Sequence, residues 1–151
     1  MVVIAALVGL DQLFKWLTIR YQPELTVGPL ELSLHFNRLN AFSLPLLGSN
    51  TARAIVSSAA IILFTWLFLS SSNRPTKYAA ALIIAGGTSN LADRIMHRAV
   101  VDVLTLTLPG SMGGIALNLA DLLITAGSAL LLFSCIRPPR KQTATAKPNS
   151  I

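Results

Sequence analysis

Residues 78–102 read YAAALIIAGGTSNLADRIMHRAVVD, and the chemistry of this stretch changes halfway along it. It is apolar from Tyr78 to Ala85 and polar from Gly86 to Arg94. A membrane-spanning helix needs roughly 20 mostly apolar residues. The stretch therefore predicts a span that begins near Tyr78 and carries polar side chains along its second half.

The composition of the whole chain points to the same class of protein. Of 151 residues, 53% are hydrophobic and only 12% are charged, and the mean hydropathy is +0.64. Soluble domains carry about 25% charged residues, and disordered chains are polar and rich in charge. A single cysteine, Cys135, excludes a disulfide scaffold. We therefore expect a small integral membrane protein.

Three further segments are candidate spans, at about 2–19, 54–69 and 115–136, and Pro138 and Pro139 end the last one. A cleaved signal peptide is a poorer interpretation of the first segment, because it has no basic start and no small-x-small cleavage site. The sequence thus predicts an α-helical integral membrane protein with four transmembrane helices and with both termini on one side.

The connections between the spans differ in character. Residues 20–50 include the alternating run from Leu30 to Phe36, which predicts a strand or hairpin. Residues 70–77 form a short basic turn, and 95–114 a second long connection. Each side of the membrane would carry six basic residues, so their total number does not set the orientation. The basic residues in short loops and near helix ends carry the most weight. The short turn and the basic tail, 137–151, then place both termini in the cytoplasm, with a disordered tail.

The six acidic residues are the most informative feature of the chain. Glu24 and Glu31 fall in the outer loop, whereas the four aspartates fall in or beside membrane segments, at positions 11, 93, 102 and 121. Ionisable groups there are costly and face the interior of the bundle. Asp11 and Lys15 lie four residues apart on one helix face, and Asp93 is next to Arg94. These two pairs predict structural ion pairs.

Asp102 and Asp121 have no such local partner, and both fall near the outer membrane surface. Two carboxylates close together in a dry site share a proton. Such a pair suits aspartic hydrolysis, in which one carboxylate activates water and its protonated partner assists the carbonyl and the leaving amine. From the spacing alone, translocation of protons or cations and structural pairing remain open alternatives.

Two asparagines accompany these acids. Asn90 shares a helix face with Asp93 and Arg94, and Asn118 precedes Asp121 by three residues. An amide can donate to a substrate carbonyl or hold a carboxylate in one rotamer. It can also serve only as a contact between helices.

Four motifs follow one another along the chain: DQLFK at 11–15, FNRLNAFS at 36–43, GGTSNLADR at 86–94 with VVD at 100–102, and NLADLLITAG at 118–127. In these motifs the chain resembles the lipoprotein signal peptidases (signal peptidase II), four-span aspartic peptidases of the bacterial inner membrane. The resemblance extends from residue 1 to about 136, which we expect to form one membrane peptidase domain.

The resemblance implies a role for each matching position. Asp102 and Asp121 would be the catalytic pair; Asn37, Asn90, Arg94 and Asn118 would bind substrate; and Asp11, Lys15 and Asp93 would support the site. Residues 20–50 would form an extracytoplasmic β-cradle, and 95–114 a lid. The substrates would be diacylglyceryl-modified prolipoproteins, cut on the amino side of the lipidated cysteine.

We expect no cofactor and no metal, since the two histidines, His35 and His97, lack a metal-like spacing. We also expect membrane lipids as partners, no nucleic-acid partner and a monomer. Cys135 is expected to be a packing residue.

The chain departs from the family pattern at six positions: Leu39, Asn40, Ser43, Ser89, Val103 and Leu117. Four of these replace small residues, mostly glycine, which allows close backbone approach. A divergent enzyme is therefore one interpretation. A paralogue that binds lipidated peptides and a small ion or proton transporter are the alternatives.

Overall fold

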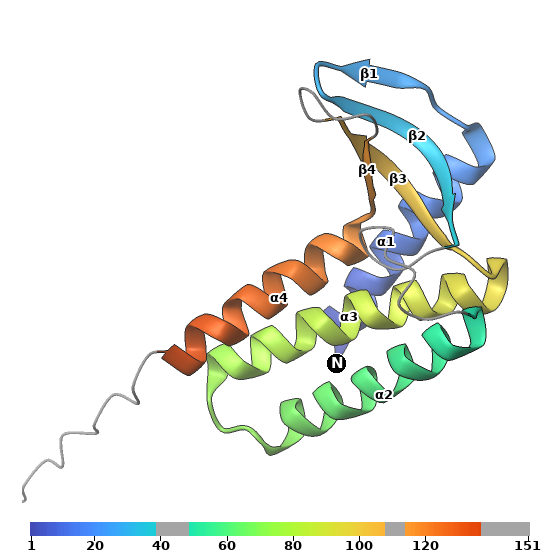
Figure 1. The fold of residues 1–151 in the computed structure, drawn as a ribbon. Coiled ribbons are helices and arrows are strands. Elements are labelled where there is room, and N and C mark those ends of the chain that lie inside the picture. Colours follow the sequence, from blue (N-terminus) through green and yellow to red (C-terminus); the bar gives the residue numbers. More distant parts are fainter. Residues whose placement is uncertain (39–48, 108–113, 137–151) are drawn as a thin grey trace, which may run out of the picture.

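The computed structural model describes residues 1–38, 49–107 and 114–136. Within these residues the chain forms four helices and four strands (Figure 1). In chain order they are α1 Val2–Tyr21, β1 Leu25–Val27, β2 Leu30–Asn37, α2 Asn50–Ser70, α3 Arg74–His97, β3 Val100–Leu106, β4 Ile115–Leu117 and α4 Leu119–Ile136. The tail from residue 137 and the motif departures at Leu39, Asn40 and Ser43 lie outside the described residues.

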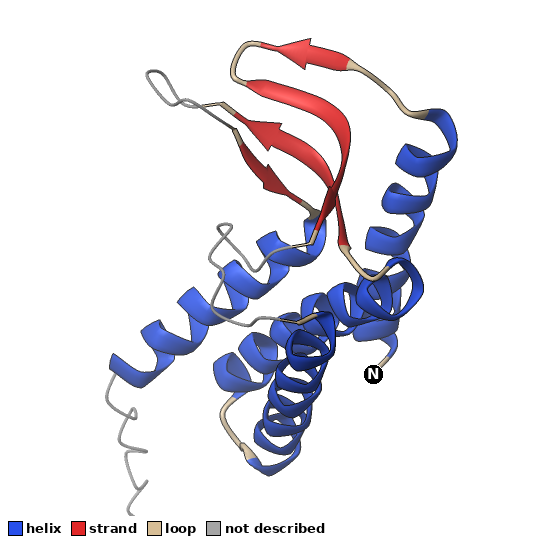
Figure 2. Cartoon of the chain, turned by 45° about the vertical axis from the view of Figure 1, so that its right-hand side comes forward, coloured by secondary structure: helices blue, strands red, loops and turns tan. Residues whose placement is uncertain are grey.

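The strands form one antiparallel sheet, in the order β1-β2-β3-β4, at one end of the helices (Figure 2). Leu25 lies opposite Leu32, Glu31 opposite Thr105, and Thr105 opposite Ala116. The register of β2 against β3 shifts between Leu32 and His35. The bulge increases the local twist of the strand.

The predicted hairpin is present, but it supplies only half of the sheet. The other half comes from 100–117, where we expected a lid and the beginning of the last span. A two-stranded hairpin alone is marginally stable, and β3 extends it by pairing with β2. The apolar run 115–117 is too short for its periodicity to separate strand from helix. It is β4, so α4 begins at Leu119 rather than near 115. Residues 108–113 of the expected lid lie outside the described residues.

α3 is the central helix and contacts each of the other three. It packs most closely on α4, where small residues let the two backbones approach. A Cβ placed on Gly86 would lie 2.4 Å from the carbonyl oxygen of Ala120, and one on Gly127 would lie 2.8 Å from that of Ala79. Interfaces between membrane helices use small residues in this way.

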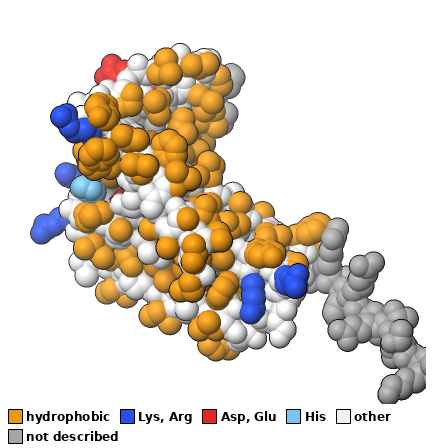
Figure 3. Space-filling model, turned by 180° about the vertical axis from the view of Figure 1, so that it is seen from behind, with side chains coloured by type: hydrophobic (Ala, Val, Ile, Leu, Met, Phe, Trp, Pro, Cys, Tyr) orange, Lys and Arg blue, Asp and Glu red, His pale blue; other side chains and the backbone are white. Residues whose placement is uncertain are grey.

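The helices bury polar residues and expose large apolar ones. Of the four buried residues of α1, three are Asp11, Lys15 and Thr18, and α2 has none that is buried. Trp66 on α2 is 64% exposed and Leu132 on α4 is 67% exposed. Figure 3 shows hydrophobic side chains spread over the outside of the helices. A cluster of buried polar residues beside a small apolar core, within an apolar exterior, is the pattern of a protein whose solvent is lipid.

Three helices, α1, α2 and α4, are long and apolar enough to cross a membrane. α3 has 24 residues, but its polar second half lowers its hydropathy. The chain is thus an integral membrane protein with a small sheet. Cys135 was expected to be a packing residue, but it is exposed near the end of α4. In a membrane, lipid would contact this position.

Candidate active site

Asp102 lies on β3 with only 1% of its surface exposed. Each of its carboxylate oxygens accepts a hydrogen bond from an amide. Asn37 Nδ2, at the end of β2, donates to Oδ2 at 3.1 Å, and Asn118 Nδ2 donates to Oδ1 at 2.8 Å. Three segments far apart in the sequence therefore meet at this carboxylate.

Asp121 lies in the first turn of α4. Asn118 precedes that helix and caps it, because the backbone N–H of Asp121 donates to Asn118 Oδ1 at 2.8 Å. The carboxylate itself accepts a hydrogen bond from Asn90 Nδ2 of α3, also at 2.8 Å. The amide–acid contacts thus cross between elements: Asn118 holds the side chain of Asp102, and Asn90 holds that of Asp121.

The electrostatics of Asp102 reflect both its burial and its neighbour. Burial raises its pKa above the ordinary value for an aspartate. The negative charge of Asp121 acts in the same direction, whereas the hydrogen bonds from Asn37 and Asn118 act against it. The charge of Asp121 therefore acts on the ionisation of Asp102, as a pair that shares a proton requires.

A buried cation, Lys15 of α1, lies close to the site. Lys15 Nζ is 2.6 Å from Asp11 Oδ2 and 2.7 Å from Asp93 Oδ2, and it donates to Asn90 Oδ1 at 3.2 Å. Its side chain is 2% exposed. Because Lys15 occupies the oxygen of the Asn90 amide, the nitrogen of that amide faces Asp121.

The two carboxylates beside Lys15 each hold the backbone next to one member of the pair. Asp11 Oδ1 accepts the N–H of Ala120, one residue before Asp121, at 2.9 Å. Asp93 Oδ2 accepts the N–H of Val101, one residue before Asp102, at 3.1 Å. The ion cluster of α1 and α3 thus connects to both β3 and α4.

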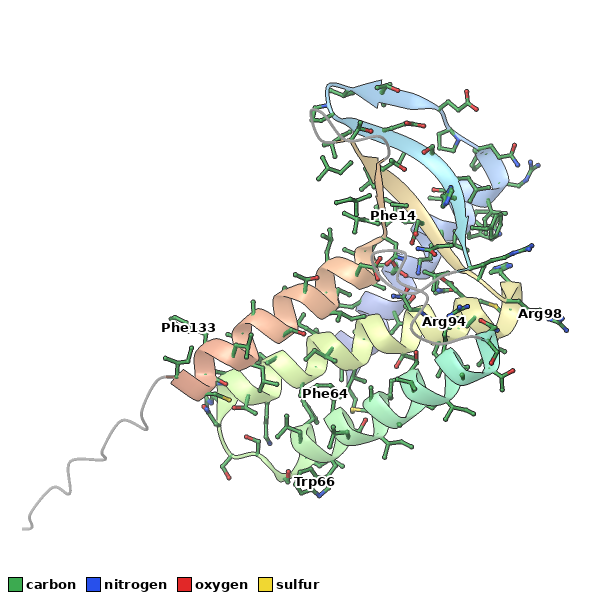
Figure 4. All side chains as sticks on the ribbon, in the orientation of Figure 1. Phe14, Phe64, Trp66, Arg94, Arg98 and Phe133 are labelled. Atoms are coloured by element: carbon green, nitrogen blue, oxygen red, sulfur yellow. The ribbon has the colours of Figure 1, made fainter. Side chains whose placement is uncertain are left out.

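The predicted pair of Asp11 and Lys15 is present, but the predicted pair of Asp93 with Arg94 is not. Asp93 bonds to Lys15, because a helix directs adjacent side chains about 100° apart and Asp93 faces α1. Arg94 Nη1 instead donates to the backbone oxygen of Asn90 at 3.1 Å. Figure 4 shows Arg94 at the sheet end of α3.

Two members of the cluster were not assigned a role from the sequence. Gln12 Nε2 donates to Asp93 Oδ1 at 2.8 Å and to Ser89 Oγ at 2.9 Å, and Ser89 Oγ donates to Asp11 Oδ2 at 2.5 Å. Ser89, which stands where the family pattern has glycine, is therefore part of the hydrogen-bond network. For Gln12, the sequence did contain a signal of such a role, because Gln12 lies between Asp11 and Lys15 in the DQLFK motif.

A bundle with an apolar exterior that holds the buried Asp102 and the half-buried Asp121 on asparagine side chains suits a membrane hydrolase of the aspartic type. A family model described as signal peptidase (SPase) II matches residues 3–137. The chain therefore belongs to the signal peptidase II family, which consists of aspartic peptidases.

Two relatives agree with this membership, and a solved structure shares the fold. The chain is 39% identical to a lipoprotein signal peptidase of Azoarcus sp. (strain BH72), over 91% of this chain and 82% of that protein. It is 34% identical to one of Polynucleobacter necessarius subsp. necessarius (strain STIR1), over 85% and 83%. A bacterial membrane enzyme solved by the in meso method at 2.3 Å has the same fold, with a TM-score of 0.78, 24% identity and coverage of 99% of this chain and 92% of that one.

Proposed function

We propose that Asp102 and Asp121 are the catalytic pair with which this chain cuts diacylglyceryl-modified prolipoproteins on the amino side of the lipidated cysteine. As a signal peptidase II, the chain is an aspartic endopeptidase that removes signal peptides from prolipoproteins. The observation that carries the residue assignment is the pair of carboxylates held by crossed amides, Asn118 on Asp102 and Asn90 on Asp121.

In the proposed reaction the pair begins with one proton. The ionised carboxylate takes a proton from a water molecule, and the water oxygen bonds to the scissile carbonyl carbon. The protonated carboxyl gives its proton to the carbonyl oxygen, which forms a tetrahedral gem-diol. When the C–N bond breaks, a proton passes to the leaving amine, and the new carboxyl group stays on the signal peptide. The pair again carries one proton at the end.

The amides would keep both carboxylates in position while the proton moves between them. Asn37 and Asn118 occupy one oxygen each of Asp102, and Asn90 occupies one oxygen of Asp121. Arg94, one helical turn beyond Asn90, would supply a cation toward a polar group of the substrate. These four residues are thus proposed to bind substrate at the two acids.

Asp11, Lys15 and Asp93 are proposed as supporting residues. They bond to the backbone beside each acid and to Asn90, but none of their described bonds is to Asp102 or Asp121 itself. We expect them to affect stability first and turnover through the position of the acids.

We further propose that α3 is a fourth span and that residues 1–136 act as one domain in the bacterial inner membrane. α3 runs alongside α2 and α4, and α1 crosses it (Figure 1). Its polar half faces the buried cluster, so lipid would not meet those groups. Four spans put both termini on the side away from the sheet. The basic residues of 70–77 and of the tail favour the cytoplasm for that side. We expect the chain to act as a monomer.

A gel-shift cleavage assay tests the proposal. A diacylglyceryl-modified prolipoprotein is mixed in detergent with the purified protein, with Asp102→Asn, with Asp121→Asn, or with Glu31→Gln as a control carboxylate on the exposed part of β2. We expect wild type and Glu31→Gln to shorten the substrate, and each aspartate variant to lose at least about 10³-fold in rate.

Other outcomes of this assay would overturn the proposal in distinguishable ways. Cleavage by both aspartate variants at the wild-type rate would refute the pair. Wild-type protein that binds the substrate without cutting it would instead be a binding paralogue. A separate assay addresses the transporter alternative: proton or cation flux through liposomes that contain the wild-type protein, without cleavage of the substrate, would favour a transporter.

A further inference from the structure

Two cavities near the proposed catalytic pair are lined by residues of one face of α4 and share one lining residue. The first, about 270 Å³, is a groove between α2, α3 and α4, and Ala60, Ile83, Asn90 and Arg94 are among its lining residues. We call it the membrane groove. The second, about 170 Å³, lies between α4 and the sheet edge β4, and Asn37, Ala116 and Asp121 line it. We call it the sheet pocket.

Among the described residues, Ile124 is the one that lines both cavities. It lies three residues after Asp121, which places it on the same face of α4 and one turn deeper. Its position is constrained from behind, because Gly86 of α3 leaves space for its Cγ1: a Cβ on Gly86 would lie 2.8 Å from that atom. The side chain of Ile124 therefore lies between the two cavities, one turn from Asp121 and against Gly86, and we call it the partition.

The two sides of this partition differ in size and in character. The membrane groove extends along α3 from Arg94 to Ile83, roughly 16 Å at 1.5 Å per residue. Its walls are mainly apolar, so it suits a hydrocarbon. The sheet pocket is smaller, and besides Asn37 and Asp121 it is lined by Thr125 and apolar residues. It suits a short side chain held beside the acids.

We propose that Ile124 is a specificity-determining residue and that the bound substrate lies on both sides of it. The hydrocarbon of the substrate would enter the membrane groove, and the side chain next to the scissile bond would enter the sheet pocket. The partition would limit the size of that side chain. This inference rests on the proposed function, because it takes Asp121 as the reacting group at the boundary.

The test compares two lipidated peptides that differ only in having Ala or Leu immediately before the cleaved bond. kcat/KM is measured for wild type, for Ile124→Ala, and for Leu122→Ala, a matched control because Leu122 is 52% exposed and lines neither cavity. We expect wild type and Leu122→Ala to prefer the Ala peptide. We expect Ile124→Ala to shift the ratio toward the Leu peptide by about tenfold or more, the usual effect of a few methylene groups in a pocket.

An unchanged ratio in an active Ile124→Ala enzyme would overturn the proposal. If Ile124→Ala does not fold, Ile124→Val replaces it, with a smaller shift expected in the same direction. Failure of the inference and failure of the proposed function give different results. In the first case Asp121→Asn abolishes cleavage of the Ala peptide, and in the second Asp121→Asn cuts that peptide at the wild-type rate.

The hydrocarbon in the membrane groove could belong to an acyl chain or to the apolar part of the signal peptide. Ala60→Phe, which narrows the groove from α2, distinguishes the two sources. If an acyl chain occupies the groove, a substrate with long acyl chains loses more in kcat/KM than one with short chains. If the signal peptide occupies it, both lose equally. No loss with either substrate would overturn this assignment of the groove.

Discussion

At the scale of single residues, the most unusual group in the molecule is Lys15. A buried cation is tolerated only when opposite charges and hydrogen bonds replace its water. Lys15 has two carboxylates within 2.7 Å and an amide oxygen at 3.2 Å, which accounts for its three donors. The cluster therefore depends on Lys15 more than on any single hydrogen bond within it.

We predict that Lys15→Met destabilises the protein by about 3–5 kcal/mol, because it leaves Asp11 and Asp93 buried without a cation. Thermal unfolding in detergent measures this. Arg74→Met, which removes an exposed charge at the beginning of α3, is the control and should change stability by less than about 0.5 kcal/mol. Equal melting temperatures for Lys15→Met and wild type would contradict the role given to the cluster.

The pH dependence of activity also belongs to single residues. A pair that works with one proton loses activity at low pH, when both acids are protonated, and at high pH, when both are ionised. Burial raises the pKa of Asp102, and the hydrogen bond from Asn37 to its ionised form lowers that pKa. Asn37→Ala should therefore raise the pKa and move the alkaline limb of the kcat/KM profile to higher pH.

Profiles of kcat/KM against pH for wild type, Asn37→Ala and Glu31→Gln check this expectation. Glu31→Gln should leave both limbs in place, because Glu31 is exposed on β2 and is not one of the groups that shift the pKa of Asp102. An alkaline limb that stays in place or moves to lower pH in Asn37→Ala would be inconsistent with ionisation of Asp102.

At the scale of elements, the contact of α3 with α4 decides whether Asn90 reaches Asp121. α3 carries Asn90 and α4 carries Asp121, and the hydrogen bond between them needs the two helices at close approach. Gly127 provides this approach two turns below Asp121. A Cβ there would lie 2.7 Å from Ile83 Cγ1 and 2.8 Å from the backbone oxygen of Ala79, and the backbone oxygen cannot move without the helix.

We predict that Gly127→Ala destabilises the protein by about 1–3 kcal/mol and lowers kcat, because it overpacks the α3–α4 interface. The matched control is Gly9→Ala in α1, where a Cβ would meet nothing within 4 Å. That change should be neutral or stabilising by up to about 1 kcal/mol. Melting temperature and kcat are measured for both, and equal effects of the two substitutions would argue against the close contact.

At the scale of the whole molecule, the helices alternate in direction so that every long connection lies at one end. The sheet continues from the ends of α1 and α3 and leads into α4, and the turn between α2 and α3 lies at the opposite end (Figure 1). If α3 is a span, the sheet and the 70–77 turn face opposite sides of the membrane.

Cysteine labelling in spheroplasts tests this arrangement. In a Cys135→Ser background, Glu24→Cys places a thiol before β1 and Asn73→Cys places one before α3, both at exposed positions. A membrane-impermeant maleimide should label position 24 from outside and label position 73 only after the membrane is opened. Labelling of both positions from outside would show that α3 does not cross.

Much of the fold could be predicted from local pattern. The apolar runs predicted the four helices, and the C-terminal ends of α2 and α4, at Ser70 and Ile136, agree with the prediction to within a few residues. The alternation from Leu30 to Phe36 gave β2. The beginning of α4 and the strand β4 could not be separated, because three apolar residues fit either structure.

The sequence by itself determined where the polar groups would be: four aspartates and two asparagines in apolar surroundings, whose desolvation cost requires partners inside the fold. Only the tertiary structure decided the partners. Asp93 bonds to Lys15 rather than to its neighbour, Asn118 holds Asp102, and Asp11 reaches Ala120 across 109 positions. The physical reason is that solvation is a property of each residue, whereas pairing depends on which helix faces meet, and contacts between distant segments leave no local periodicity in the sequence.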